Sequence, residues 1–228
     1  RRRLEEGCRR LALDLDVQRA FDELHALAAG QVRCIVKLLV TRGDAQARGY
    51  GITGMDQPRR IALRYDWPDA PDSIATHGAR VVTVRTRLGE STQLAGIKHL
   101  NRLEQVLARI EIAPSGEDEG LLTSSSRRVI SGSMSNVFLV SHAEIVTPRV
   151  DRCGIAGVMR AVVFREAGRA GLKMREADVE LPELAHASEV FLTNVRIGIW
   201  PVRELDGRRL QPGPLTRRLQ NMLEGIDA

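Results

Sequence analysis

Lys98 is the residue whose type and setting most clearly suggest chemistry. The chain has 34 basic residues, but only Lys37, Lys98 and Lys173 are lysines. An arginine stays protonated in proteins, whereas a lysine amine can lose its proton and form a Schiff base. Because apolar residues 94, 95 and 97 flank Lys98, we expect partial desolvation, which favours the neutral, nucleophilic amine. The alternative is a lysine at a helix start whose amine extends into solvent.

Several other kinds of site are excluded by motif. The sequence has no phosphate-binding Gly-x-x-x-x-Gly-Lys loop, no His-Glu-x-x-His and no Cys-x-x-Cys. Its five histidines lack ligand spacing, so we predict no metal site. The serine-rich runs 124–126 and 131–135 lack the Gly-x-Ser-x-Gly elbow of a nucleophile. Cys8, Cys34 and Cys153 are widely spaced and odd in number, which predicts reduced, buried thiols in a cytoplasmic protein.

The charge of the chain argues against nucleic acid as a partner. The net charge is +5 and the pI about 9.6, but basic and acidic residues alternate along the whole sequence. Aromatic residues make up only 4%, which leaves few surfaces for base stacking. No apolar run is long enough to span a bilayer, and no apolar core follows the basic N-terminus. We therefore predict a cytoplasmic protein with neither a nucleic-acid nor a membrane partner.

Hydrophobic periodicity predicts a mixture of helices and strands without a regular βαβ repeat. This pattern is typical of an α+β or mixed α/β protein. A stretch with two prolines predicts a linker at 67–72, between a small domain at 1–66 and a larger one at 73–228. We predict helices over 4–15, 17–29, 100–110, 154–170 and 214–224, and strands over 31–41, 59–65, 81–88, 119–124, 127–131, 136–140, 144–147, 172–179, 189–193 and 199–202.

Residues 94–108 read Leu-Ala-Gly-Ile-Lys-His-Leu-Asn-Arg-Leu-Glu-Gln-Val-Leu-Ala. This segment resembles the cofactor-lysine segment of fold-type IV pyridoxal-phosphate enzymes, and among them most closely that of the 4-amino-4-deoxychorismate lyases. Branched-chain and D-amino-acid aminotransferases belong to the same family. The resemblance implies a small N-terminal α/β domain, a larger C-terminal domain with a pseudo-barrel, and pyridoxal 5'-phosphate as cofactor. It makes Lys98 the catalytic residue that forms the aldimine with that cofactor.

Further matches to this family imply how the cofactor phosphate is bound. Arg3 resembles the arginine that binds the phosphate, a role that suits a guanidinium fork. Val158 and Met159 match a helix start that offers backbone N–H groups to an anion. Asn194 and Val195 match a second turn on the phosphate side. The valine stands where the aminotransferases commonly have threonine, so backbone contact is what we expect there.

Ser131 and one surface loop are the remaining matches. Most family members carry a glutamate at the position of Ser131, where it pairs with the pyridine nitrogen. A hydroxyl can bind a neutral nitrogen but does not hold its proton, so the ring withdraws electrons less strongly. This favours an elimination that ends in an aromatic ring over transamination, and it is also compatible with an inactive site. Arg48 and Tyr50 match the substrate-side loop and are expected to bind substrate carboxylates.

The resemblance implies a lyase that converts 4-amino-4-deoxychorismate to 4-aminobenzoate, a folate precursor, and pyruvate. Two alternatives remain open: a D-amino-acid or branched-chain aminotransferase, and a non-catalytic protein of the same fold. We expect a homodimer, because family active sites lie near a subunit interface. Family chains normally begin further upstream, so we expect the first part of the small domain to be missing from the sequence that starts at Arg1.

Overall fold

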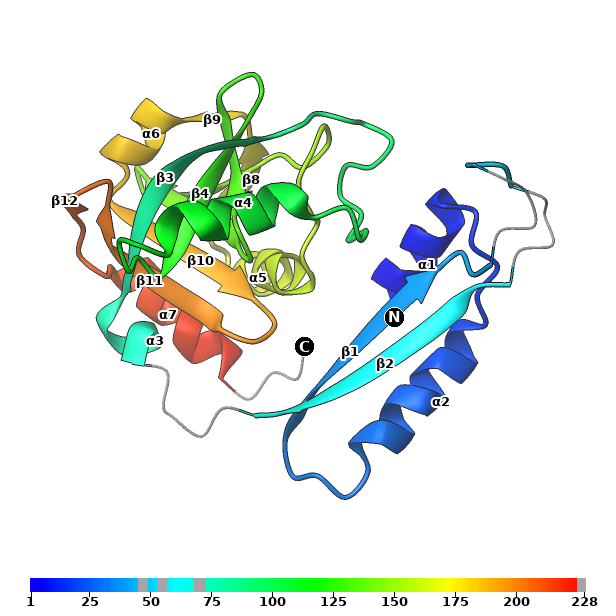
Figure 1. Ribbon diagram of the computed structural model, residues 1–228. Coiled ribbons are helices and arrows are strands. Elements are labelled where there is room, and N and C mark those ends of the chain that lie inside the picture. Colours follow the sequence, from blue (N-terminus) through cyan, green and yellow to red (C-terminus); the bar gives the residue numbers. More distant parts are fainter. Residues whose placement is uncertain (45–48, 53–56, 68–72, 225–228) are drawn as a thin grey trace. The chain divides into compact units, whose positions relative to one another are not determined.

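The computed structural model describes residues 1–44, 49–52, 57–67 and 73–224. The chain forms two compact units, Arg1–Pro71 and Asp72–Ala228 (Figure 1). Most of the linker predicted at 67–72 lies outside the described residues. Its first residue, Trp67, is described, and the Arg33 guanidinium stacks on the Trp67 ring at 3.8 Å from the ring centroid.

The first unit is a two-stranded antiparallel sheet with two helices. Strands β1 (Cys34–Thr41) and β2 (Arg59–Asp66) pair along their full length, from Cys34 opposite Asp66 to Thr41 opposite Arg59. Helix α2 (Val17–Ala28) is fastened to β2 by a two-pronged ion pair between Arg60 and Glu23.

The helix predicted over 4–15 is wrong at its C-terminal end. Helix α1 (Arg2–Arg10) ends earlier, and Ala12 adopts a positive φ of 48°. The Arg42 guanidinium donates to the carbonyls of Leu11 and Ala12, which holds the chain in this turn. Asp16 then caps α2 by accepting a hydrogen bond from the Arg19 N–H. An N-cap requires non-helical backbone, so the helical spacing of Leu11 and Leu15 does not extend α1.

The second unit is built around one mixed sheet of ten strands. Its order is β8-β7-β6-β10-β11-β3-β4-β5-β9, with the short β12 on β11. Three pairings are parallel, β11 with β3, β3 with β4 and β7 with β8, and the others are antiparallel. The strands are β3 (Ala79–Leu88), β4 (Glu119–Ser124), β5 (Arg128–Gly132), β6 (Asn136–Ser141), β7 (Glu144–Pro148), β8 (Met174–Ala177), β9 (Val179–Glu180), β10 (Glu189–Asn194), β11 (Gly198–Leu205) and β12 (Arg208–Arg209).

The sheet curves into a nearly closed pseudo-barrel, which confirms the predicted α+β class and the pseudo-barrel. Its main core contains Leu121, Val137, Leu192 and Val202, all fully or almost fully buried. These residues come from strands far apart in sequence, so closing the sheet removes their apolar surface from water together.

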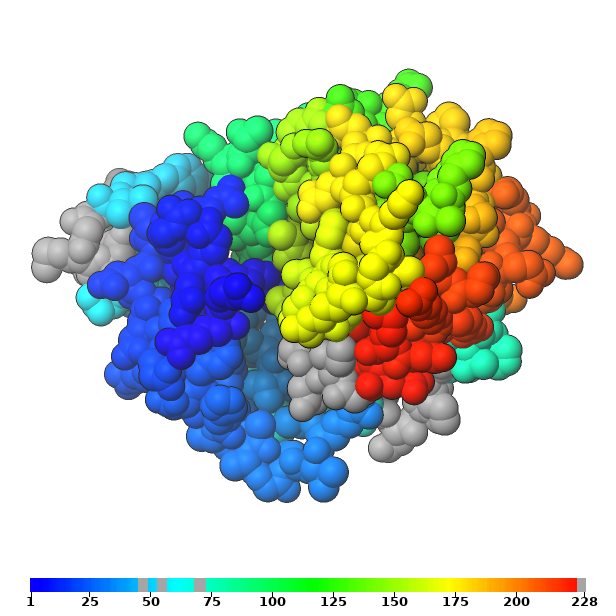
Figure 2. All heavy atoms as spheres, turned by 180° about the vertical axis from the view of Figure 1, so that it is seen from behind, coloured from blue at the N-terminus to red at the C-terminus, as the bar shows by residue number. Residues whose placement is uncertain are grey.

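Helices cover the outside of this sheet (Figure 1). Helix α5 (Val158–Arg169) and helix α7 (Pro214–Leu223) pack around the stacked rings of Phe138 and Phe191, whose centroids are 4.7 Å apart. Figure 2 shows α7, in red, beside the yellow segment that includes the end of α5. Helix α4 (Leu103–Ile112) covers a third cluster, which includes Leu88, Leu122 and Ile130.

Most of the predicted elements are present, but the single strand predicted over 172–179 is wrong: β8 and β9 divide it and pair at opposite ends of the sheet, with β7 and with β5. Three short elements are additions. Helices α3 (Ser73–His77) and α6 (Leu181–His186) and strand β12 were not predicted from the sequence. The helix predicted from residue 154 begins only at Val158, because Gly154 has a φ of 86° and Gly157 is the extended N-cap. Within the described ranges, no helix combines the length and apolar character needed to cross a membrane.

Candidate active site

Lys98 lies in the loop between β3 and α4, in the second unit. Ala95 and Ile97 are buried, whereas Lys98 is exposed. The flanking apolar side chains turn into the core and the lysine turns out of it, so the expected desolvation by these neighbours is wrong. Arg102 fixes the backbone of this loop, because its guanidinium donates to the carbonyls of Ile97 and His99 at 2.9 and 3.0 Å.

Backbone hydrogen bonds join the lysine loop to the segment that precedes α5. Gly96 forms a parallel bridge with Ile155. The Gly96 N–H donates to the Gly154 carbonyl, and the Ala156 N–H donates back to the Gly96 carbonyl, both at 3.0 Å. Lys98 therefore lies two residues after Gly96, whose backbone is hydrogen-bonded to the segment before α5.

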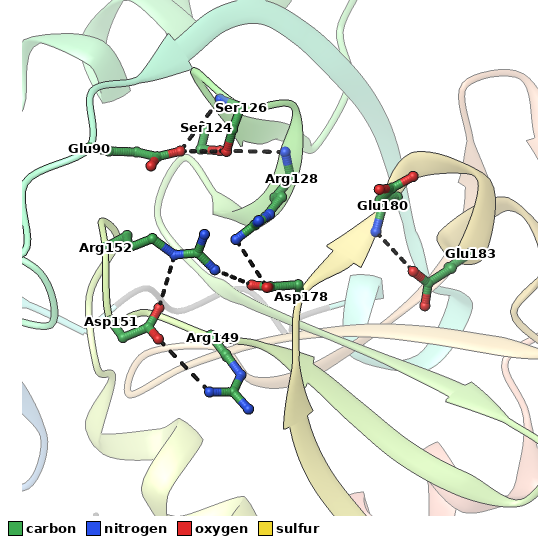
Figure 3. A network of polar contacts seen from close by, with 10 residues as sticks. All are labelled: Glu90, Ser124, Ser126, Arg128, Arg149, Asp151, Arg152, Asp178, Glu180 and Glu183. Atoms are coloured by element: carbon green, nitrogen blue, oxygen red, sulfur yellow. Dashed lines mark hydrogen bonds and ion pairs between the residues drawn. The ribbon is translucent and has the colours of Figure 1, made fainter.

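The segment before α5 is also held by a polar network (Figure 3). Arg152 and Arg128 converge on Asp178, with N–O distances of 2.5 and 3.0 Å. The Arg152 carbonyl accepts a hydrogen bond from the Ser91 N–H at the other end of the lysine loop. Glu90, next to Ser91, accepts from the Ser126 hydroxyl at 2.6 Å. These contacts connect the lysine loop to the segment before α5 and to the turn between β4 and β5.

The N-terminus of α5 can bind an anion. The first N–H groups of any α-helix have no partner within the helix and carry the positive end of its dipole. Gly157 is the N-cap, and in the described part of the chain no side chain caps the helix there. Val158 and Met159 are the first helical residues, so their backbone N–H groups are the predicted phosphate donors.

The arginine that follows these two residues has a structural task. Arg160 is buried, and its guanidinium donates to the Pro148 carbonyl and to Glu176. It also lies over the Phe164 ring at 5.1 Å from the ring centroid. What residues 157–160 share with the phosphate-binding helix start of the family is therefore their backbone N–H groups.

Asn194 and Val195 form a turn at the end of β10. The Asn194 carboxamide oxygen accepts from the N–H groups of Arg196 and Ile197 at 2.8 and 3.0 Å. Its amide nitrogen donates to the Met134 carbonyl at 3.0 Å. Val195 is exposed, so its side chain contributes no buried contact and its backbone stands at the surface of the turn.

Ser131 lies on β5, just before the turn that contains Met134. It is buried, and its hydroxyl makes no side-chain hydrogen bond within the described residues. Asn136, at the start of β6, was missed by the sequence analysis, although an Asn beside a Gly-Ser-Met-Ser run is a typical turn signal. Its amide nitrogen donates to the Ile155 carbonyl at 2.9 Å, which ties the turn to the α5 approach.

Four sets of predicted residues thus converge within the second unit. The lysine loop contacts residues 154–156, Asn136 contacts Ile155, and Asn194 contacts Met134. These contacts connect the segments that carry the predicted residues: the lysine loop, the turn that follows β5, the approach to α5 and the Asn194 turn.

The remaining predicted residues lie in the first unit. Arg3 is exposed on α1. Tyr50 is fully exposed. Arg48 lies outside the described residues. The roles of all three therefore stay predictions.

The three cysteines differ in how far they are buried. Burial raises the pKa of the Cys153 thiol to about 11, and the negative charges of Glu90 and Glu104 act in the same direction. The thiol is therefore protonated, and not nucleophilic, near pH 7. Cys8 is buried as well, but Cys34 is only half-buried, which corrects the expectation for that residue. Across the described ranges, no three His, Cys, Asp or Glu residues are grouped so that they could hold a metal ion.

The chain belongs to the aminotransferase class IV family, whose model matches residues 1–205. Pyridoxal 5'-phosphate is the cofactor of this family. The fold-type IV resemblance seen in the sequence is therefore confirmed.

Two relatives are aminodeoxychorismate lyases. The lyase of Vibrio harveyi is 33% identical over 192 residues, which are 82% of this chain and 70% of that protein. The crystal structure of 4-amino-4-deoxychorismate lyase from Pseudomonas aeruginosa superposes with a TM-score of 0.93 at 47% identity, covering 97% of this chain and 82% of that one. A third relative, the D-alanine aminotransferase of Listeria innocua, is 31% identical over 182 residues, or 74% of this chain and 62% of that protein.

The residues of the second unit fit this cofactor. A phosphate dianion suits the uncapped N–H groups at the start of α5. The close approach there depends on glycine, because a Cβ on Gly157 would lie 2.1 Å from the Asn136 carboxamide oxygen. An exposed primary amine at Lys98 and a buried serine at Ser131 are group types that suit the cofactor's aldehyde and its ring nitrogen.

Proposed function

We propose that this protein is a pyridoxal-phosphate-dependent lyase that converts 4-amino-4-deoxychorismate to 4-aminobenzoate and pyruvate. The observation that carries the proposal is the 47% identity, over 97% of the chain, to the Pseudomonas aeruginosa lyase. The residues of the second unit support it with an amine, a hydroxyl and two phosphate-side turns on connected segments.

Each of these residues has a distinct task in this reaction. Lys98 would hold the cofactor through Nζ, and the same amine would act as the general base toward the substrate. Val158, Met159, Asn194 and Val195 would orient the phosphate through backbone N–H groups. Arg3, in the first unit, is proposed as a further phosphate ligand on the family resemblance alone. When bound, pyridoxal phosphate withdraws electrons and makes the hydrogen on the amine-bearing carbon acidic.

The proton leaves the amine-bearing carbon of the substrate and moves to Lys98 Nζ. The carbon–oxygen bond to the neighbouring enolpyruvyl group breaks and the oxygen keeps its electron pair. The six-membered ring becomes aromatic, and the released enolate takes up a proton on its methylene carbon to give pyruvate. Arg48 and Tyr50 are proposed to bind the substrate carboxylates, since a guanidinium pairs with a carboxylate through two hydrogen bonds.

Ser131 is proposed to contact the ring nitrogen. A hydroxyl does not keep that nitrogen protonated as a carboxylate would, so extensive carbanion stabilisation is weaker. Formation of the aromatic ring supplies part of the driving force for elimination, and transamination lacks this gain. The alternative function, an amino-acid aminotransferase, has the support of the family and of the Listeria innocua relative.

A direct assay separates these two functions. The protein with pyridoxal phosphate is incubated with 4-amino-4-deoxychorismate, and 4-aminobenzoate is followed by its fluorescence and pyruvate by coupled reduction. We expect equal amounts of the two products. Parallel incubations pair D-alanine or L-leucine with 2-oxoglutarate. Transfer of the amino group to 2-oxoglutarate without any 4-aminobenzoate would replace the lyase proposal with the aminotransferase. No turnover in any incubation, with a colourless protein, would indicate a non-catalytic family member.

Lys98→Ala tests the central residue of the proposal. We expect the cofactor absorbance near the visible edge to disappear and lyase activity to fall at least about a hundredfold. Lys173→Ala is the matched control, because Lys173 is also an exposed lysine of the second unit but lies between α5 and β8. Its spectrum and activity should match those of the wild type. An unchanged spectrum in Lys98→Ala would remove Lys98 from the cofactor site.

We also propose the cytoplasm as the location and a homodimer as the assembly. The three unpaired cysteines fit a reducing compartment. The dimer is supported by the outer face of α4, where several large apolar side chains are exposed.

A further inference from the structure

Glu119 is a buried carboxylate that neither the sequence analysis nor the proposed reaction uses. It is the first residue of β4, its exposed fraction is 0%, and it lies opposite Val81 on β3. A carboxylate in such a place is costly unless hydrogen bonds compensate it fully.

Five donors surround the two oxygens of this carboxylate. Oε1 accepts from the N–H groups of Gly120 and Ser133, both at 3.0 Å, and from the Ser133 hydroxyl. Oε2 accepts from the Ser135 hydroxyl at 2.8 Å and from the Met134 N–H at 3.2 Å. Four of the five donors belong to the turn at 133–135. An ionised carboxylate only accepts hydrogen bonds, so it matches this set of donors.

The turn is moulded closely around the carboxylate. A Cβ on Gly132 would lie 2.7 Å from Glu119 Oε2 and 2.2 Å from the Ser135 hydroxyl. The Gly132 N–H closes the turn by donating to the Ser135 carbonyl at 2.8 Å. The conformation of the turn therefore depends on the position of the Glu119 carboxylate.

The 133–135 turn and the adjoining Asn136 also contact both segments assigned to the phosphate, the Asn194 turn and the approach to α5. The Met134 carbonyl accepts from the Asn194 amide at 3.0 Å, which fixes the turn after β10. Asn136 donates to the Ile155 carbonyl at 2.9 Å, and its carboxamide oxygen occupies the space beside Gly157 at the start of α5. Two hydrogen bonds, through Met134, lead from Glu119 to Asn194. On the other side, Ser135 binds Glu119 and its neighbour Asn136 binds Ile155, which precedes α5.

We propose that Glu119 is the positioning residue of the cofactor-phosphate site, acting through the 133–136 turn on the Asn194 turn and on the N-terminus of α5. The proposal rests on the assignment of these two segments to the phosphate in the proposed function. Backbone donors bind an anion well only when they are held in place beforehand, since ordering them on binding would cost affinity.

The test measures the affinity of the full-length apoprotein for pyridoxal 5'-phosphate in Glu119→Gln, by titration of absorbance. The amide would place an N–H group against the donors of the turn, so we expect Kd to rise about tenfold or more. Hydrogen exchange should speed up at the backbone amides of 194–197 as well as 133–136, at temperatures well below unfolding. Glu117→Gln is the matched control, because Glu117 pairs with Arg80 and makes no contact with the turn. It should keep wild-type Kd and exchange.

Ser135→Ala is a milder variant that settles the question if Glu119→Gln fails to fold. It removes one donor from Oε2 and leaves the carboxylate in place, so Kd should rise about three- to tenfold. A wild-type Kd with unchanged exchange at 194–197 in Ser135→Ala, or in a folded Glu119→Gln, would overturn the proposal. Neither measurement depends on the lyase reaction. Failure of the proposed function would show instead as wild-type protein that binds the cofactor and releases no 4-aminobenzoate.

Discussion

Ser131 is the single residue with most influence on which reaction the proposed site favours. Its side chain is buried on β5 and makes no side-chain hydrogen bond to any described residue, so its hydroxyl remains available to a ligand. Hydroxyl and carboxylate differ in whether they can hold a proton on a pyridine nitrogen, and this difference changes how strongly the ring withdraws electrons. In the proposed site, this one side chain therefore favours elimination over transamination.

Ser131→Glu should move the bound cofactor toward its ring-protonated form. We expect a shift in the absorbance maximum of the bound cofactor and a several-fold fall in the ratio of lyase to aminotransferase activity. Ser131→Ala removes the hydroxyl without adding a charge, so it should leave the absorbance maximum near that of the wild type. If Ser131→Glu binds the cofactor but changes neither spectrum nor rate, Ser131 does not lie at the ring nitrogen.

At the scale of elements, α5 connects the phosphate donors to the core. Its first turn presents backbone N–H groups, while Val163 and Ala167 on its inner face are fully buried against the sheet. The start of the helix is set by Gly157, which packs on Asn136 from a different strand. If the start of α5 binds the phosphate as proposed, cofactor binding and core packing are coupled through the position of this helix.

Gly157→Ala should weaken both properties. Its added Cβ would meet the Asn136 carboxamide oxygen at 2.1 Å, and overpacking of this kind costs about 1–3 kcal/mol. For a unit of this size we expect Tm to fall by roughly 2–10 °C, together with weaker binding of pyridoxal phosphate. Gly168→Ala, in the same helix, meets no atom within 4 Å and should stabilise the protein by about 0.5–1 kcal/mol. Equal effects of the two substitutions in a thermal scan would contradict the packing argument.

At the scale of the whole molecule, the outer face of α4 is the surface on which the proposed dimer would form. Five large apolar side chains lie at helical spacing on or just before this helix, and each is more than half exposed. They are Leu100, Leu103, Val106, Leu107 and Ile110. A contiguous apolar patch of this kind usually marks an interaction site, and isologous contact between two copies is the commonest form.

Leu107→Glu should shift the protein from dimer to monomer. A charge at the centre of an apolar interface is left without a partner, so we expect the dimer dissociation constant to rise at least about tenfold. Sedimentation velocity over a range of concentrations gives this constant. Gln211→Glu adds the same charge at an exposed site far along the chain and should leave the dimer intact. A wild-type dimer in Leu107→Glu would place the interface elsewhere.

The amino-acid sequence by itself determined the family, the cofactor and most of the elements. A run such as 94–108 carries its information locally, and the periodicity of apolar residues sets helices and strands without reference to distant parts of the chain. Predictions from local pattern were wrong where a residue far away in the sequence determines the local structure. The end of α1 depends on Arg42, thirty residues or more along the chain from the carbonyls that it holds.

Only the tertiary structure decided how the candidate site is assembled. Asn194 meets Met134 because β6 and β10 pair antiparallel, with Asn136 opposite Thr193. The lysine loop meets the start of α5 through the bridge between Gly96 and Ile155. Glu119 carried no sequence signal, since its role exists only where β4 brings its carboxylate to the turn between β5 and β6. Such contacts depend on strand order and register, which follow from burial of the whole sheet and not from any one segment.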